Sequence, residues 1–204
     1  MLAVAVAPAQ GSEPAPNEVP SLVTVPTVDQ ARVVQSPPKL ALVLAGGGAR
    51  GLAHIGVLKI LERGKIHVDY ISGTSIGALI GSLSAARLSA HDIETIALDG
   101  KLGKAFFPRS AVLQEIIYLP SYVFMRVLQL KPALGLYSGK SIAKFVEKNL
   151  PAKYKNIEQL PTPFVAVSVD LSTGAKLVHS KGNIAKAVQA SCSVPLLYRP
   201  VKAG

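Results

Sequence analysis

Apolar residues along the chain form short blocks whose lengths alternate between those of strands and helices. Residues 40–45 are an unbroken apolar run that ends in three glycines at positions 46–48. A continuous run of this length is typical of a strand buried on both faces. After the glycines, leucine and isoleucine recur at helical spacing over residues 52–63, and Gly64 follows in the place of a helix-ending glycine. The pattern therefore predicts a strand, a glycine loop and a helix.

The same order of elements follows at once. Residues 68–71 predict a second strand, 72–77 a glycine-flanked turn and 78–88 a helix rich in small residues. Two such units in tandem are typical of a parallel α/β sheet. Further apolar patterns predict helices at 91–99, 141–149 and 184–190, and strands at 164–169 and 177–179 that pair across 172–174. We therefore expect one α/β domain with a mostly parallel central sheet and flanking helices.

The first 38 residues differ in character from the rest. They contain seven prolines and no sustained periodicity, which predicts a disordered leader, with the globular domain at 39–204. The apolar start closes on Ala7-Pro8-Ala9, a small-residue pattern typical of the end of a secretory signal, although no basic segment precedes it. This pattern favours a residual signal peptide and an exported protein (periplasmic, outer-membrane-associated or secreted) over a cytoplasmic one. The alternative is an alanine-rich tail.

Residues 111–130 are apolar on most sides and are interrupted by Pro120. Such a segment can be a lid that lies on a membrane surface. Two core helices joined at the proline are the favoured alternative, because helices that are apolar all round are usually buried.

The net charge of +10 favours anionic partners such as a phospholipid surface. Lysines that only solvate helix faces would give the same total. Nucleic acid is not expected, because the chain has neither a zinc-finger spacing nor a basic run interleaved with aromatics. The single cysteine, Cys192, and four scattered histidines, including His54, fit no metal spacing and receive no role.

Residues 73–77 read Gly-Thr-Ser-Ile-Gly, the G-x-S-x-G pattern, between a predicted strand and a predicted helix. In that setting a sharp turn, which needs Gly73 and Gly77, presents a serine hydroxyl at the sheet edge. The positive end of the helix dipole favours a developing alkoxide there. The motif predicts Ser75 as a nucleophile, with a chance match in a turn as the alternative.

The glycine loop can supply hydrogen-bond donors. The backbone N–H groups of Gly46, Gly47 and Gly48 can form an anion-binding concavity, to which Arg50 adds positive charge. Together with Gly51 the loop also matches G-x-G-x-x-G, and Asp69 follows roughly 20 residues later, as in dinucleotide-binding proteins. The serine turn favours the hydrolase over this rival, because a nicotinamide-binding fold has no use for it.

The two motifs, with Ser-Val-Asp-Leu-Ser-Thr-Gly at 168–174 and Ala-Ser-Cys-Ser-Val-Pro at 190–195, closely resemble the bacterial patatin-like phospholipases over about residues 39–204. The resemblance implies Ser75 as the nucleophile and Gly46, Gly47, Gly48 and Arg50 as the oxyanion hole. It further implies a lipase, esterase or phospholipase A activity on lipid esters, without a metal or organic cofactor.

The resemblance also implies a Ser-Asp dyad whose aspartate belongs to an Asp-Gly-Gly or Asp-Gly-Ala motif. That motif follows the S-x-x-x-P segment, and the sequence ends at Gly204 before reaching one. We therefore expect the catalytic aspartate beyond Gly204 and a domain that is incomplete at its C-terminus, with an inactive lipid-binding remnant as the alternative. Neither Asp99 nor Asp170 matches the motif. A triad of Ser75, Asp170 and His179 has the chain order of α/β-hydrolases, but only one strand precedes the Ser75 unit.

Overall fold

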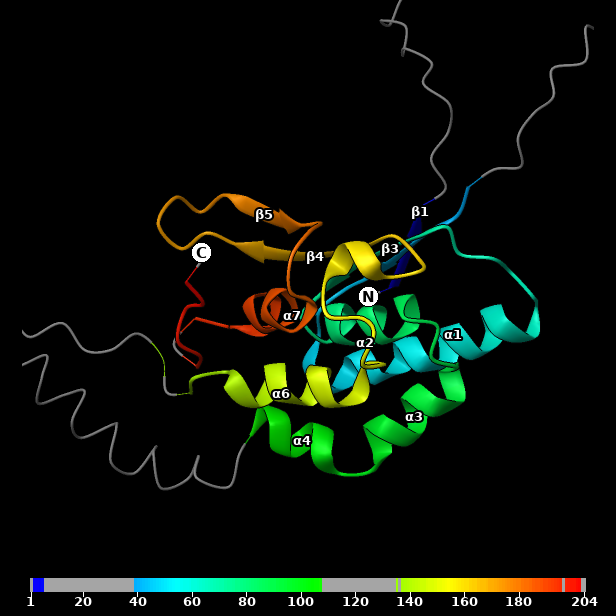
Figure 1. Ribbon diagram of the computed structural model, residues 1–204, viewed down its shortest axis with the longest axis horizontal. Helices are drawn as coiled ribbons and strands as arrows, with labels where there is room; N and C mark the ends of the chain where they lie inside the picture. The colour runs from blue at the N-terminus through cyan, green and yellow to red at the C-terminus, as the bar shows by residue number, and fades with distance from the viewer. Residues whose placement is uncertain (1, 6–38, 108–134, 136, 196, 203–204) are drawn as a thin grey trace, which may run out of the picture.

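The computed structural model describes residues 2–5, 39–107, 135, 137–195 and 197–202 (Figure 1). Within these described residues, five strands form one sheet in the order β1-β2-β3-β4-β5. The strands are β1 (Leu2–Ala5), β2 (Ala41–Leu44), β3 (Tyr70–Thr74), β4 (Phe164–Val169) and β5 (Lys176–His179). The α-helices are α1 (Ala53–Arg63), α2 (Ile76–Ala85), α3 (Ala90–Leu98), α4 (Lys101–Phe106), α6 (Lys140–Asn149) and α7 (Ile184–Cys192), and the 3-10 helices are η1 (Gly48–Leu52) and η2 (Ile157–Gln159).

The centre of the sheet is parallel, as predicted. Strand β3 pairs in parallel with β2 on one side and with β4 on the other. The two edge strands, β1 and β5, run antiparallel to their neighbours, and β5 returns from β4 through the hairpin expected at 172–174. Because β2, β3 and β4 are parallel, their carboxyl ends lie at one edge of the sheet, and the segments that follow them meet there.

The helices form layers beneath one face of this sheet (Figure 1). Helix α2 packs on β3 and α7 packs on β4, while α6 covers α7 and in turn contacts α4. Glycine permits the close approach of α2, since a Cβ atom at Gly81 would lie 3.0 Å from Cγ2 of Ile71 and 3.2 Å from the Phe164 ring. The most deeply buried large side chains between these layers are Leu42, Leu44, Ile80, Leu83, Ile93, Ile142, Ile184, Val146 and Val188.

The second strand differs from the prediction in position. It was expected at 68–71 with a turn at 72–77, but β3 runs from Tyr70 to Thr74 and α2 begins at Ile76. Pairing with both neighbours carries β3 past the glycine at 73, which overrides the turn preference of that residue. The turn is therefore confined to a single residue, Ser75. Helix α4 was not predicted, because its six residues are too few to show a periodic pattern.

Several predictions concern residues outside the described part of the chain. Of the leader expected at 1–38, Leu2–Ala5 form β1, and residues 6–38 are not among the described residues. The apolar segment 111–130 is not among them either. None of the helices that the structure describes combines the length and the apolar character of a membrane span.

Candidate active site

Ser75 is the single residue between β3 and α2, and its backbone is strained. Its φ and ψ are 54° and −124°. Among the described non-glycine residues, positive φ occurs only at Lys65, Ser75 and Arg87. Backbone conformations of this kind cost of order 1–3 kcal/mol and persist where the surrounding structure holds them. This backbone conformation turns the chain sharply from strand to helix and leaves the serine at the tip of the turn.

The glycines on either side of Ser75 occupy positions where a side chain does not fit. A Cβ atom at Gly73 would lie 2.5 Å from Cα of Ala78. A Cβ atom at Gly77 would overlap the carbonyl oxygen of Leu44 and lie 2.7 Å from that of Ala45. Both contacts are with backbone, which cannot move aside as a flexible side chain would. The spacing of the G-x-S-x-G motif thus has a steric cause at each glycine.

The glycine loop after β2 lies against this turn. A Cβ atom at Gly46 would be 3.4 Å from Cβ of Ser75, and one at Gly51 would overlap the side chain of Ile76. Gly47 and Gly48 have φ values of 156° and 56°, and the N–H of Arg50 donates to the Gly47 carbonyl at 3.2 Å. A pocket of about 410 Å³ opens beside the loop, lined by Gly46, Gly47, Arg50, Gly51, Ala53, His54 and Val57. Loop, pocket and serine therefore occupy the same edge of the sheet.

Two side chains without a predicted role anchor these loops. His54 is buried, and its Nε2 lies 2.9 Å from the carbonyl oxygen of Ala45, directly before the glycines. Because a carbonyl only accepts, Nε2 is the protonated nitrogen and donates. Ser191, at the end of α7, accepts a hydrogen bond from the Ser75 N–H at 2.8 Å. His54 is only nine residues from Ala45, so this contact could have been suspected from the sequence. Ser191 is 116 residues from Ser75, and nothing in the sequence near either serine indicates their contact.

Residues of the alternative sites are not brought together. Asp170 accepts hydrogen bonds from the N–H and the hydroxyl of Ser172, which lower the pKa of its carboxyl, and His179 Nε2 lies 2.7 Å from Oγ of Ser168. Neither contacts Ser75. Asp69 accepts from the Leu40 N–H at 2.7 Å, at the amino end of β3. It is thus at the opposite end of the strands from the glycine loop, whereas a dinucleotide site needs the two together.

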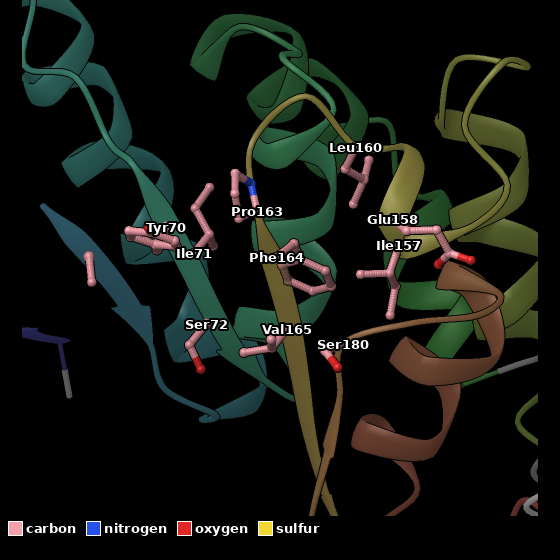
Figure 2. A pocket seen from close by; sticks show the side chains of 11 residues that line it. Tyr70, Ile71, Ser72, Ile157, Glu158, Leu160, Pro163, Phe164, Val165 and Ser180 are labelled. Atoms are coloured by element: carbon pink, nitrogen blue, oxygen red, sulfur yellow. The ribbon is translucent and has the colours of Figure 1, made fainter. Parts of the chain in front are cut away.

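A second pocket lies at the amino ends of the strands. It has a volume of about 400 Å³ and a mainly apolar lining from β3, β4 and the η2 region, including Tyr70, Leu160 and Phe164 (Figure 2). Within the described residues, no three His, Cys, Asp or Glu side chains are grouped to hold a metal ion. This pocket lies at the opposite end of the strands from Ser75 and the glycine loop.

Two buried acidic groups, the Cys192 thiol and the Tyr198 hydroxyl, have raised pKa values. Burial raises the pKa of the Cys192 thiol to about 12, partly opposed by a hydrogen bond with the Ser75 side chain. Burial also raises the pKa of Tyr198 to about 12, helped by the proximity of Cys192 and Tyr137, and its hydroxyl donates to the Phe106 carbonyl at 2.6 Å. Both groups are therefore protonated in the folded protein at neutral pH, and Cys192 does not act as a thiolate there.

These pKa shifts predict a loss of stability at alkaline pH. The two groups ionise in the unfolded chain near their ordinary values of 9.0 and 10.0, but not in the fold. Their contribution is therefore fully present below about pH 9 and is lost as the pH rises toward about 12. Urea unfolding from about pH 8 to about pH 11 should show a falling free energy of unfolding, with a shallower fall in Tyr198→Phe. An equal fall in that variant would contradict the assignment to Tyr198.

Comparison with known proteins places these features in context. The sequence model of patatin-like phospholipases matches residues 42–204. The chain is 34% identical over 170 residues to an uncharacterized NTE family protein of Mycobacterium tuberculosis, covering 81% of this chain and 25% of that protein. It is 34% identical over 155 residues to human patatin-like phospholipase domain-containing protein 6, covering 76% and 10%. The type III effector ExoU aligns with a TM-score of 0.47 at 18% identity over 76% of this chain and 40% of the effector chain. The chain thus spans a quarter or less of the length of these curated relatives.

Proposed function

Because the chain belongs to the patatin-like phospholipase family, we propose that it is a serine acyl hydrolase that cleaves lipid esters with Ser75 as the nucleophile. The observation that carries the proposal is the strained Ser75 turn with the glycine loop packed directly against it. Membership of the family supports lipid ester hydrolysis in general. The residue roles, and the phospholipase A type of cleavage, rest on the geometry and on the resemblance of the motifs.

The first chemical step is attack of the Ser75 Oγ on the ester carbonyl carbon. A bond forms between Oγ and carbon, and the carbonyl electron pair moves onto oxygen. When the tetrahedral intermediate collapses, the bond between its carbon and the alcohol oxygen breaks, the alcohol leaves with the proton that Ser75 gave up to the base, and the acyl group stays on Ser75. Water then attacks the acyl carbon through the same two steps, and the fatty acid leaves Ser75. The position of Ser75 at the amino end of α2 places the helix dipole beside the developing charge.

The glycine loop is suited to hold the oxyanion. Within the described residues, the N–H groups of Gly46 and Gly47 have no hydrogen-bond acceptor. They lie on the loop that packs against Ser75 and lines the adjoining pocket with Arg50. Backbone donors preorganised in this way stabilise an oxyanion more than the neutral carbonyl. Removal of one such donor typically costs about 10²–10³ in rate.

The hydroxyl proton of Ser75 has to pass to a base. In the part of the chain that the structure describes, Ser75 is hydrogen-bonded to Ser191, Cys192 and Leu79, and to no carboxylate or imidazole. The Cys192 thiol is neutral and a poor acceptor. The base is therefore not assigned to any described residue.

Fluorophosphonate labelling tests this function directly. A reactive serine in an oxyanion site should form a covalent adduct that mass spectrometry maps to Ser75. Nicotinamide and flavin nucleotides should leave the melting temperature unchanged. A melting shift with nucleotides and no adduct would favour the dinucleotide-binding alternative. Absence of both, with vesicle binding retained, would favour a lipid-binding remnant.

The lysines of α4 and α6 are suited to an anionic membrane surface, which we propose as the partner. Lys140, Lys144 and Lys148 are exposed and spaced four residues apart on α6, and α4 beside it adds Lys101 and Lys104. Glu147 and Asp99 reduce the net positive charge of this face. Each lysine near an anionic lipid surface contributes about 1 kcal/mol to the free energy of membrane binding.

A triple change of Lys140, Lys144 and Lys148 to glutamine should weaken binding to phosphatidylglycerol vesicles by roughly 100-fold. The matched control changes Lys153, Lys155 and Lys181, which are also exposed but lie on other segments. Co-sedimentation with phosphatidylglycerol and phosphatidylcholine vesicles measures both variants. Equal weakening in the two would show that total charge matters and the α6 face does not.

A further inference from the structure

The hydroxyl of Ser191 joins three parts of the fold at the candidate active site. It accepts the N–H of Ser75 at 2.8 Å and donates to the carbonyl of Val167 at 2.6 Å. Ser191 belongs to the last turn of α7 and Val167 to β4, while Ser75 follows β3. We propose that Ser191 is a positioning residue that holds the backbone of the nucleophile in its strained conformation. This inference rests on the proposed function of Ser75.

The direction of both hydrogen bonds follows from the atoms present. The Val167 carbonyl can only accept, so the single proton of the Ser191 hydroxyl points at it. The Ser75 amide can only donate, so it occupies a lone pair of the same oxygen. Each bond therefore orients the other. A hydroxyl fixed in this way offers its lone pair to Ser75 in one direction.

The Ser75 amide needs such a partner because the turn removes it from the sheet. Thr74 is the last residue of β3 paired with β4, opposite Val167. The Ser75 N–H, one residue further on, donates to the Ser191 hydroxyl, and that hydroxyl donates to the Val167 carbonyl of β4. Without Ser191 this part-buried donor would lose its acceptor, and the strained turn could relax toward an ordinary conformation.

The neighbouring residue reinforces the contact. The Cys192 thiol lies within hydrogen-bonding reach of the Ser75 side chain and is almost fully buried. Consecutive residues of α7 thus contact the backbone and the side chain of the nucleophile.

Ser193 provides a matched comparison at the same helix end. Its hydroxyl donates to the Gln189 carbonyl at 2.7 Å, a bond within α7 and the residue that follows it. Like Ser191, it is part-buried. A Ser193→Ala change removes the same atoms and one hydrogen bond, but leaves the contact with Ser75.

The experiment compares Ser191→Ala, Ser191→Thr and Ser193→Ala in the 204-residue chain. For hydrolysis of a p-nitrophenyl ester we expect Ser191→Ala to lower kcat by about 10–100-fold with KM changed less than about twofold, since misplacement of a reacting group acts on the chemical step. The rate of fluorophosphonate labelling should fall in parallel. Ser191→Thr keeps the hydroxyl and should recover most of the rate, and Ser193→Ala should resemble the unaltered chain.

The outcomes separate this proposal from the assignment of Ser75. Equal kcat in Ser191→Ala and Ser193→Ala would overturn the positioning role, and so would a loss in Ser191→Thr as large as in Ser191→Ala. If the unaltered chain neither hydrolyses nor labels, the proposed function fails. Hydrogen exchange of the Ser75 amide then decides about Ser191. Exchange accelerated by about 10-fold or more in Ser191→Ala alone supports the contact, and unchanged exchange overturns it.

Discussion

Replacing Ser75 by alanine is expected to lower ester hydrolysis by at least about 10³-fold, because the change removes the nucleophile itself. Activity on short and long p-nitrophenyl esters and on phosphatidylcholine measures the effect, and fluorophosphonate labelling should disappear in the same variant. Alanine adds no atom to the turn, so the free energy of unfolding should change by less than about 1 kcal/mol. The loss of activity would then come from chemistry and not from unfolding.

The control for this variant is Ser72→Ala. Ser72 lies three positions earlier in β3, and its side chain lines the pocket at the other end of the strands (Figure 2). Its removal should leave hydrolysis within about twofold of the unaltered chain, as for most substitutions away from a site. Hydrolysis retained in Ser75→Ala would show that another residue is the nucleophile. Hydrolysis that requires Ser75 would direct the search for its base to residues outside the described part of the chain, since Asp170 and His179 are hydrogen-bonded elsewhere.

Replacing Gly77 by alanine is expected to lower the free energy of unfolding by at least about 3 kcal/mol. The new methyl group would overlap the Leu44 carbonyl oxygen, and β2 would have to move away from α2. Both partners belong to the central layers of the fold, so the displacement cannot be confined to a loop. Urea unfolding measures the change, and loss of soluble expression would be its most severe form.

Gly56→Ala is the matched control. Gly56 is exposed within α1, and a Cβ atom there would meet no other atom within 4 Å. Alanine should therefore stabilise the protein by about 0.5–1 kcal/mol, because glycine loses more conformational entropy in a helix. If Gly77→Ala unfolded at the same urea concentration as Gly56→Ala, the close approach of α2 to β2 would not be a constraint on this position.

Much of the fold follows from local pattern. The apolar runs identified β2, β4 and β5, and helical spacing identified α1, α3, α6 and α7, each within a few residues of the observed ends. The error at β3 has a physical cause: Gly73 looks like a turn residue in isolation, yet it lies within a strand that pairs on both sides. Local preference is weak for a residue whose conformation depends on two neighbouring strands.

Residue type and spacing were enough to predict the candidate site and the loops on which its groups lie. Gly46, Gly48, Gly73, Ser75 and Gly77 all follow predicted strands, and parallel strands end at one edge. Three features could be established only in the folded structure: Ser191 meets Ser75 across 116 positions, His54 anchors the glycine loop, and Asp69 lies at the far end of the strands. The reason is that residue type and spacing govern local conformation, whereas a hydrogen bond between distant residues depends on how the strands and helices pack.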